Sequence, residues 1–171
     1  TYSFALKKGI CFSDGDSVTL EDIEASITAF CDISIDSEYT QWLNYLDGYE
    51  EYRNGMGDRI TGIHIEGEII SFTFIRPHFS NIWAFLVPIQ KAEALNTTSG
   101  NVAAYILEGN SKNIGTGPYF FSRMRESSIE LEKNENYWGE KANNNIVYIA
   151  NSNPSVVAEE FERGMIDLYS Y

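Results

Sequence analysis

The sequence predicts an α+β fold, in which a mixed sheet with hairpins is flanked by peripheral helices. Residues 60–75 and 119–133 each alternate between apolar and polar side chains on both sides of a turn, as β-hairpins do. Residues 20–30 instead repeat their apolar side chains at helical spacing. Hydrophobic residues make up 43% of the chain and aromatic residues 14%, which indicates a folded domain with a core and not a disordered tail.

The N-terminal elements follow from local patterns. Residues 1–8 alternate as a half-buried strand does, and the Ser-Asp-Gly-Asp run at residues 13–16 predicts a turn. Thr19 then caps a helix, with Asp22 at the third helical position, where an acid is favoured near a helix N-terminus. The buried stripe of this helix comprises Leu20, Ile23, Ile27 and Phe30.

The first hairpin is predicted to turn at residues 66–67. That register pairs Ile63 with Ile70 and Thr61 with Phe72 on one apolar face. Helical or irregular segments flank this hairpin, at residues 37–46, 48–57 and 80–86.

The second half of the chain begins with residues 92–109, which fit no pattern clearly; within them, residues 102–107 could form a strand or a helix. Three further strands are predicted, at residues 119–124, 128–133 and 146–150. Asn153 and Pro154 then begin a helix, because asparagine caps a helix and proline suits its first turn, and Gly164 ends it.

The chain is strongly acidic. It has 25 Asp and Glu residues against 12 Lys and Arg, a net charge of −13, which repels phosphate backbones and anionic lipid headgroups. We therefore expect neither a nucleic-acid partner nor a role at a membrane surface. No apolar stretch approaches the length of a membrane span, and no charged-then-apolar leader begins the chain, so we expect a processed chain or a piece of a larger protein.

The two cysteines do not make a disulfide framework. Cys11 lies in a predicted extended segment and Cys31 follows the first helix. They could pair if that helix folds back, but free, partly buried thiols are the favoured interpretation.

Two segments are candidates for binding a ligand. The Gly-Thr-Gly run at residues 115–117 lacks the spacing of a phosphate-binding loop and precedes a strand. Its glycines would let the backbone turn sharply and approach another chain closely. The second candidate is the aromatic row Tyr39, Trp42 and Tyr45, whose spacing places the rings along one helix face, where they line either a pocket or the core.

Histidine and carboxylate side chains near the first hairpin invite a metal-binding interpretation. His64, Glu66 and Glu68 are residue types that bind metals, but a solvated sheet face with a hairpin tip explains them better. His78 follows a proline and fits a surface loop.

Glu130 and Glu132 lie on one face of a predicted strand, and paired carboxylates can serve as acid and base in catalysis. They alternate with Ile129 and Leu131. The alternation predicts that the isoleucine and leucine face inward and that the carboxylates form the solvent side of the strand.

Several short runs occur in the order and spacing found in one protein family. They are TYSFALKKGICFSDG at residues 1–15, LEDI at 20–23, GIHI and ISFTF at 62–65 and 70–74, GTGPY and LEKNENYWG at 115–119 and 131–139, and FERGMID at 161–167. Together they resemble the family 5 extracellular solute-binding proteins, the peptide-binding receptors of bacterial ABC importers. Cys11 departs from the pattern, since the family usually carries a polar or basic residue there.

The resemblance implies a binding protein and not an enzyme, without catalytic residues, a metal site or a cofactor. Its fold would be part of lobe I of a two-lobed, class II periplasmic-binding-protein-like structure. Residues 1–110 would form a subdomain of lobe I and residues 111–171 the start of its adjoining sheet region. The second lobe would be absent from these residues.

The resemblance also implies how such a protein works. Two lobes close over an extended oligopeptide, and the closed form docks on the membrane subunits of the importer. We therefore expect a lipid-anchored protein at the cell surface or a periplasmic one, which meets the membrane only through its anchor or by docking. The expected ligand-binding residues are Thr116 and Gly117, which lie near the cleft in this family, with Tyr39 and Trp42.

Two alternatives remain at the level of the sequence. The ligand could be another solute, such as an oligosaccharide or a nickel complex, because a fold does not fix its ligand. The less favoured alternative is a glycoside hydrolase that uses Glu130 and Glu132.

Overall fold

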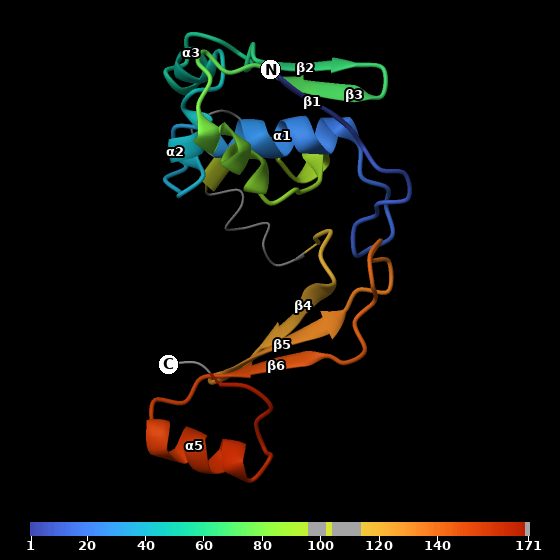
Figure 1. Ribbon diagram of the computed structural model, residues 1–171, viewed down its shortest axis with the longest axis vertical. Helices are drawn as coiled ribbons and strands as arrows, with labels where there is room; N and C mark the ends of the chain where they lie inside the picture. Colours follow the sequence, from blue (N-terminus) through green and yellow to red (C-terminus); the bar gives the residue numbers. More distant parts are fainter. Residues whose placement is uncertain (96–101, 104–113, 170–171) are drawn as a thin grey trace.

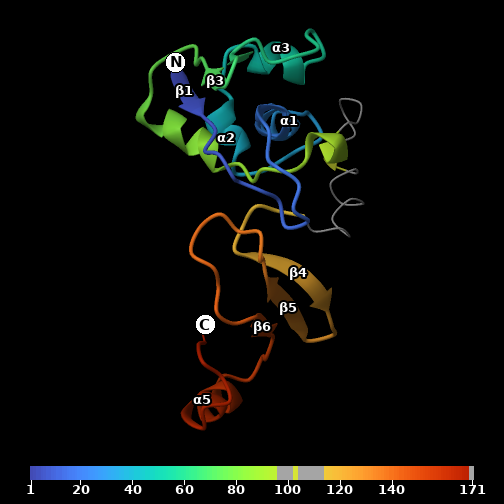
Figure 2. The same cartoon turned by 90° about the vertical axis from the view of Figure 1, so that its right-hand side faces the viewer.

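The computed structural model of the protein describes residues 1–95, 102–103 and 114–169. Residues 1–95 with 102–103 form a first part, and residues 114–169 form a second part; each has its own three-stranded antiparallel sheet (Figure 1). The predicted α+β fold with hairpins and peripheral helices is confirmed, and the described strands form two antiparallel sheets where one mixed sheet was expected. The two parts meet along one side of the molecule (Figures 1 and 2). Among the helices of these described residues, none is long and apolar enough to cross a membrane.

The first part holds most of the helices. Its elements are β1 (Tyr2–Ala5), α1 (Leu20–Phe30), α2 (Thr40–Leu43), α3 (Tyr49–Arg53), β2 (Ile63–Glu66), β3 (Ile69–Phe72) and the 3-10 helices η1 (Phe79–Leu86) and η2 (Ala92–Leu95). Strand β3 lies between β1 and β2. Helix α1 runs across one face of this sheet (Figure 1).

Helix α1 begins as predicted. The Thr19 hydroxyl accepts a hydrogen bond from the Asp22 N–H at 3.2 Å, and the Asp22 carboxylate accepts one from the Thr19 N–H at 2.8 Å. This reciprocal capping box satisfies two N–H groups that the helix itself leaves without a partner.

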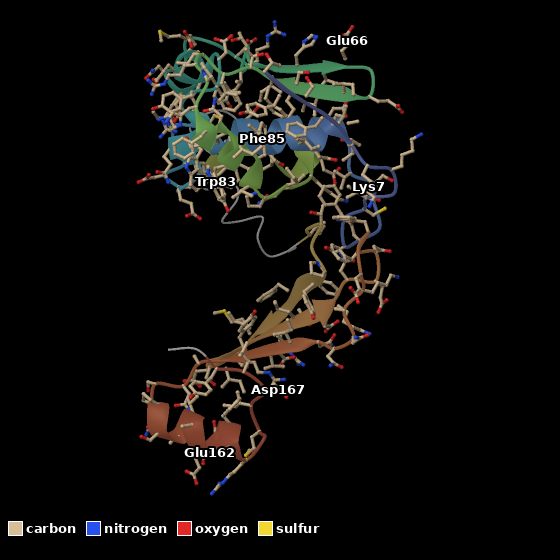
Figure 3. The ribbon with its side chains drawn as sticks, in the orientation of Figure 1. Lys7, Glu66, Trp83, Phe85, Glu162 and Asp167 are labelled. Carbon is tan, nitrogen blue, oxygen red and sulfur yellow. The ribbon has the colours of Figure 1, made fainter. Side chains whose placement is uncertain are left out.

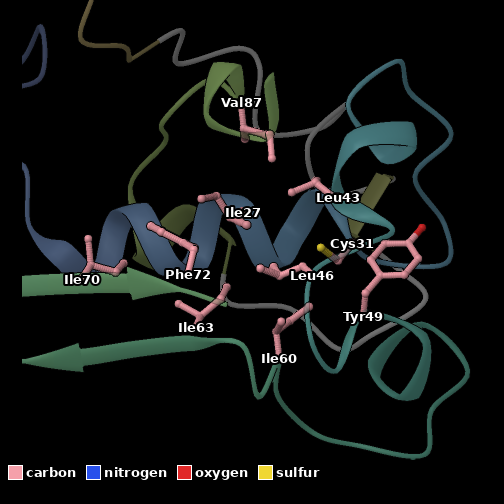
Figure 4. Packing of buried hydrophobic residues seen from close by; sticks show 11 residues of the cluster. Ile27, Cys31, Leu43, Leu46, Tyr49, Ile60, Ile63, Ile70, Phe72 and Val87 are labelled. Atoms are coloured by element: carbon pink, nitrogen blue, oxygen red, sulfur yellow. The ribbon is translucent and has the colours of Figure 1, made fainter. Parts of the chain in front are cut away.

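The core of the first part surrounds α1, between this helix and the sheet and between it and α2 and η1 (Figure 4). Its largest fully buried apolar side chains are Phe72, Leu43, Leu46 and Ile70. The predicted stripe of α1 contributes to this core: Ile27 is buried, and Leu20, Ile23 and Phe30 pack against it half-buried. Removal of this apolar surface from water is the main force that holds the first part together.

The register of the first hairpin differs from the predicted one. The two-residue loop begins at Gly67, and Ile63 lies opposite Phe72. The predicted pairs Ile63–Ile70 and Thr61–Phe72 are therefore wrong. Gly67 has a φ of +60°, which tight hairpin turns require at their first loop position and which glycine adopts without strain. Because each partner moves by two residues, the same side chains still face the core.

The other helical segments are shorter or tighter than predicted. Within residues 37–46 only α2 is α-helical, and turns flank it. The helix predicted at residues 80–86 is the 3-10 helix η1. Of residues 102–107, the structure describes Val102 and Ala103, which are helical.

The second part consists of β4 (Tyr119–Met124), β5 (Ser128–Lys133), β6 (Ile146–Ile149) and α5 (Pro154–Glu162). All three strands were predicted and are confirmed. The Asn153 side chain accepts hydrogen bonds from the N–H groups of Ser155 and Val156, which confirms the predicted cap of α5. The boundary expected at residue 110 lies outside the described residues.

Both cysteines are free thiols, as predicted. Cys31 is fully buried at the end of α1, and this burial raises the pKa of its thiol far above the usual value. Cys11 is half-buried.

Candidate functional site

The Gly-Thr-Gly segment lies at the junction of the two parts and is held from both sides. The Gly115 carbonyl accepts a hydrogen bond from the Ser13 N–H at 2.9 Å, and the Gly115 N–H donates to Ser13 Oγ at 3.4 Å. The Gly117 carbonyl accepts a bond from Asn134 Nδ2 at 2.8 Å. The backbone of Thr116, between these glycines, is thus fixed at both ends.

The contacts within this chain do not require the two glycines. A Cβ added at Gly115 would meet no atom of its surroundings within 4 Å, and one at Gly117 would meet only the Tyr119 carbonyl oxygen, at 3.8 Å. Neither glycine has a positive φ. Among the described residues, no close approach of another chain segment requires them, and the space beside this backbone is open.

Two asparagines after β5 complete the junction. Asn134 is 2% exposed; its side chain holds Gly117, its N–H donates to the Pro118 carbonyl at 2.9 Å, and its Oδ1 accepts from the Asn136 N–H. Asn136 Nδ2 in turn donates to the Ser13 carbonyl at 3.0 Å. Because these bonds connect the turn at Ser13 to both ends of the Gly-Thr-Gly segment, they form a closed ring around the junction.

A cation–π contact also joins the two parts. Lys7 Nζ lies 4.5 Å from the centre of the Trp138 ring. Lys7 is on the side of the molecule where the parts meet (Figure 3). The junction is therefore held by side chains as well as by backbone hydrogen bonds.

The predicted aromatic row does not stay together. Tyr39 and Trp42 are half-buried against the core, with ring centres 6.1 Å apart. Tyr45 lies elsewhere, since its ring is 4.0 Å from the Arg76 guanidinium and 6.1 Å from the His78 ring. Tyr39 and Trp42 are therefore partly core residues, which was the alternative to a pocket.

Trp83 of η1 takes the place that was expected for Tyr45. Its ring centre is 6.3 Å from that of Trp42, and its side chain is half-exposed. Trp83 was not among the residues predicted to bind a ligand. The sequence of η1 could have indicated it, because this short helix has apolar side chains on all sides and only one side can face the core. The apolar side chains of η1 that remain exposed are Phe79, Ile82, Trp83 and Leu86.

The expected binding residues form two separate pairs. No hydrogen bond or ring contact among the described residues connects Tyr39 and Trp42 to Thr116 and Gly117. Two open hollows of about 480 and 500 Å³ lie on the first part, and none of these four residues lines either of them.

The glutamates of β5 are engaged in ordinary surface contacts. Glu130 accepts hydrogen bonds from Arg123 at 2.8 Å and Arg125 at 2.9 Å, and the bond from Arg123 chiefly lowers the pKa of its carboxyl. Glu132 accepts a bond from the Ser122 hydroxyl. A carboxylate held ionised by two guanidiniums is poorly suited to donate a proton as a general acid. Ile129, which we expected to face inward, is 39% exposed.

The histidines have structural positions. His64 lies opposite Ser71 in the first sheet, and no group of three His, Cys, Asp or Glu side chains suited to a metal occurs in the part of the chain that the structure describes. His78 is at the surface, as predicted, where Nδ1 accepts from the Ser80 N–H and caps η1.

Comparison with known proteins identifies the family. The model of the bacterial extracellular solute-binding proteins, family 5 (middle region), matches residues 1–171. The chain therefore belongs to this family, as its sequence motifs implied.

Individual relatives agree. The oligopeptide-binding protein OppA of Bacillus subtilis (strain 168) is 26% identical over 178 residues, which cover 98% of this chain and 31% of the relative. Lactococcal OppA, solved in complex with an endogenous peptide in the closed conformation, superimposes with a TM-score of 0.77 at 25% identity over 96% of this chain and 32% of that one. NikZ from Campylobacter jejuni, solved with Ni(L-His), superimposes with a TM-score of 0.74 at 20% identity over 96% of this chain and 30% of that one.

These comparisons confirm the fold class, since the chain matches part of a lobe of two-lobed binding proteins. The family consists of bacterial extracellular solute-binding proteins, and two curated relatives are named as oligopeptide-binding proteins, one of them periplasmic. The chain spans about a third of the length of the curated relatives it matches.

Proposed function

We propose that the chain is part of the substrate-binding component of an ABC importer that captures oligopeptides outside the cell. The observation that carries this proposal is the match of nearly the whole chain, in sequence and in fold, to a lactococcal oligopeptide-binding protein solved with a peptide. The protein would be anchored by a lipid at the cell surface or would lie in the periplasm, and its partners would be the membrane subunits of the importer.

The junction supports a site that reads the peptide backbone. The Gly-Thr-Gly segment presents main chain beside open space and is fixed at both ends. Hydrogen bonds to a peptide's main chain give affinity with little dependence on the peptide's sequence. In this proposal Thr116 and Gly117 meet the main chain of the ligand, and Tyr39 and Trp42, with Trp83, contact its side chains.

The division of the chain is part of the same proposal. Residues 1–110 would be a subdomain of lobe I and residues 111–171 the start of the adjoining sheet region, with the second lobe supplied by sequence outside these residues. Closure of the two lobes would then bury the peptide.

Calorimetry tests the proposal. We expect full-length protein to bind a peptide such as RPPGFSPFR, the nonapeptide bound by a relative from Haemophilus influenzae, and residues 1–171 alone to bind it weakly or not at all, because half of the clamp is missing. Micromolar binding by residues 1–171 alone would contradict the two-lobe mechanism. If the full-length protein binds an oligosaccharide or a nickel complex and has no affinity for peptides, the proposed ligand class is wrong.

A further inference from the structure

Lys91 is a buried lysine that the binding proposal does not use. Its side chain is 9% exposed, and Nζ forms ion pairs with Asp14 Oδ2 at 2.5 Å and with Asp16 Oδ2. Phe12 borders it, with the ring centre 5.7 Å from Nζ. Since a buried ammonium group is costly unless charged partners compensate for its lost hydration, the two aspartates of one turn account for its position.

The backbone on both sides of Lys91 is attached to α1. The Gln90 N–H donates to Ser26 Oγ at 2.8 Å, and the Ala92 N–H donates to the Asp22 carboxylate, also at 2.8 Å. The base of the lysine side chain is thereby fixed to the core helix. The two ion pairs therefore connect the turn to a backbone segment that is itself attached to α1.

The turn that Lys91 holds is rigid within itself. The Phe12 N–H donates to the Asp16 carbonyl at 2.8 Å, the Gly15 N–H donates to the Phe12 carbonyl at 3.0 Å, and the Asp16 N–H donates to Asp14 Oδ1 at 3.2 Å. A displacement of the two carboxylates would therefore move the whole turn, including Ser13.

Ser13 connects this turn to the junction by hydrogen bonds. It makes two hydrogen bonds with Gly115 and accepts a third, on its carbonyl, from Asn136. A continuous series of contacts thus leads from α1, through Lys91 and the turn, to the Gly-Thr-Gly segment.

We propose that Lys91 is a positioning residue that sets where the Gly-Thr-Gly segment lies relative to the first part, and so how a bound peptide meets Thr116. This inference rests on the proposed function for its second half. Its physical basis is the charge balance of the turn: without the ammonium group, Asp14 and Asp16 are like charges in one turn and repel each other, and the turn loses its ion pairs with the segment around Lys91.

The test compares three variants of the full-length protein. Lys91→Met removes the charge and keeps much of the apolar side chain, and Lys91→Arg keeps the charge. Arg163→Met is the control, since it breaks an exposed ion pair between the C-cap of α5 and Glu159. Hydrogen exchange is followed at the amides of Ser13 and Asn134, which donate to Gly115 and Pro118. We expect Lys91→Met to speed both exchanges and to weaken the binding of RPPGFSPFR by about tenfold or more, and the other two variants to retain both properties.

A double-mutant cycle separates positioning from general destabilisation. If Lys91 acts through the turn at Ser13, whose Oγ accepts from the Gly115 N–H, the effects of Lys91→Met and Ser13→Ala on peptide affinity are not additive. Unchanged exchange in Lys91→Met, faster exchange with unchanged affinity, or additive effects would each overturn the inference. Failure of the unmodified protein to bind the peptide would count against the proposed function. The hydrogen-exchange data alone would then show whether Lys91 positions the Gly-Thr-Gly segment.

Discussion

Asn134 donates a hydrogen bond from Nδ2 to the Gly117 carbonyl at 2.8 Å, across 17 positions of sequence. The donor is almost completely buried, and the acceptor belongs to the segment that we propose as the ligand-facing backbone. This bond attaches the segment to the end of β5. It helps to hold the Gly-Thr-Gly segment in one conformation, although its two glycines restrict the backbone little.

The first prediction concerns this bond. Replacement of Asn134 by alanine leaves the Gly117 carbonyl without its partner and should lower the free energy of unfolding by about 1–3 kcal/mol. Asn145→Ala is the matched control, because Asn145 also makes a side-chain bond to the backbone, from Lys133, but is exposed. Urea denaturation of both variants checks the prediction, and equal losses of stability would contradict it.

The second prediction concerns pH. The hydrogen bond from Lys91 lowers the pKa of Asp14 below the usual 3.8. A lowered pKa contributes stability that is present above the pKa of the unfolded chain and is lost as the pH falls through the folded value. Asp14→Asn should therefore cost stability at neutral pH, by less than about 1 kcal/mol because Asp14 is partly exposed, and the difference from the unmodified protein should shrink below about pH 4.

Denaturation curves at neutral and acidic pH measure this difference. Asp167→Asn provides a comparison without the lysine partner. A stability difference for Asp14→Asn that stays constant from neutral pH to well below the aspartate pKa would argue against the ion pair.

The third prediction concerns the core of the first part. Phe72 is 1% exposed, so Phe72→Ala should lower the free energy of unfolding by about 3–5 kcal/mol, through the lost burial and the cavity left behind. Phe79 is 83% exposed, and Phe79→Ala should change stability by less than about 0.5 kcal/mol. Thermal unfolding of the two variants provides the comparison, and a similar loss in both would show that the core is placed wrongly.

The fourth prediction compares two glycines of positive φ. Gly48 has a φ of +81° and Gly55 one of +68°. A Cβ at Gly48 would lie 2.6 Å from the Thr61 backbone nitrogen, whereas one at Gly55 would meet nothing within 4 Å. Gly55→Ala should cost about 1–2 kcal/mol for the strained backbone alone, and Gly48→Ala should cost clearly more. Equal thermal midpoints of the two variants would contradict this reading of the contact.

The secondary-structure elements that depend on residues close together in the sequence were predicted correctly. The cap at Thr19, the cap at Asn153 and the strands β4 to β6 depend on neighbouring residues, and the structure has them as predicted. The register of the first hairpin was missed because two adjacent loop positions fit the alternation equally well. The structure decides between them by pairing Glu66 with Ile69.

The contacts at the junction could not be predicted because their partners are distant in sequence. Lys91 and its aspartates are 75 and 77 positions apart, and no local pattern marks a lysine for burial. For the same reason Trp83 was not associated with Trp42, because η1 and α2 are separated by the first hairpin. The family motifs indicated the Gly-Thr-Gly segment, but its attachment to Ser13 and Asn134 comes from the structure.

Native mass spectrometry of the full-length protein, purified without added ligand, tests the central claim most directly. We predict that retained masses fragment as short peptides, which would also show the preferred peptide length. A retained sugar or metal complex, with no peptide, would contradict the claim that this chain belongs to an oligopeptide receptor.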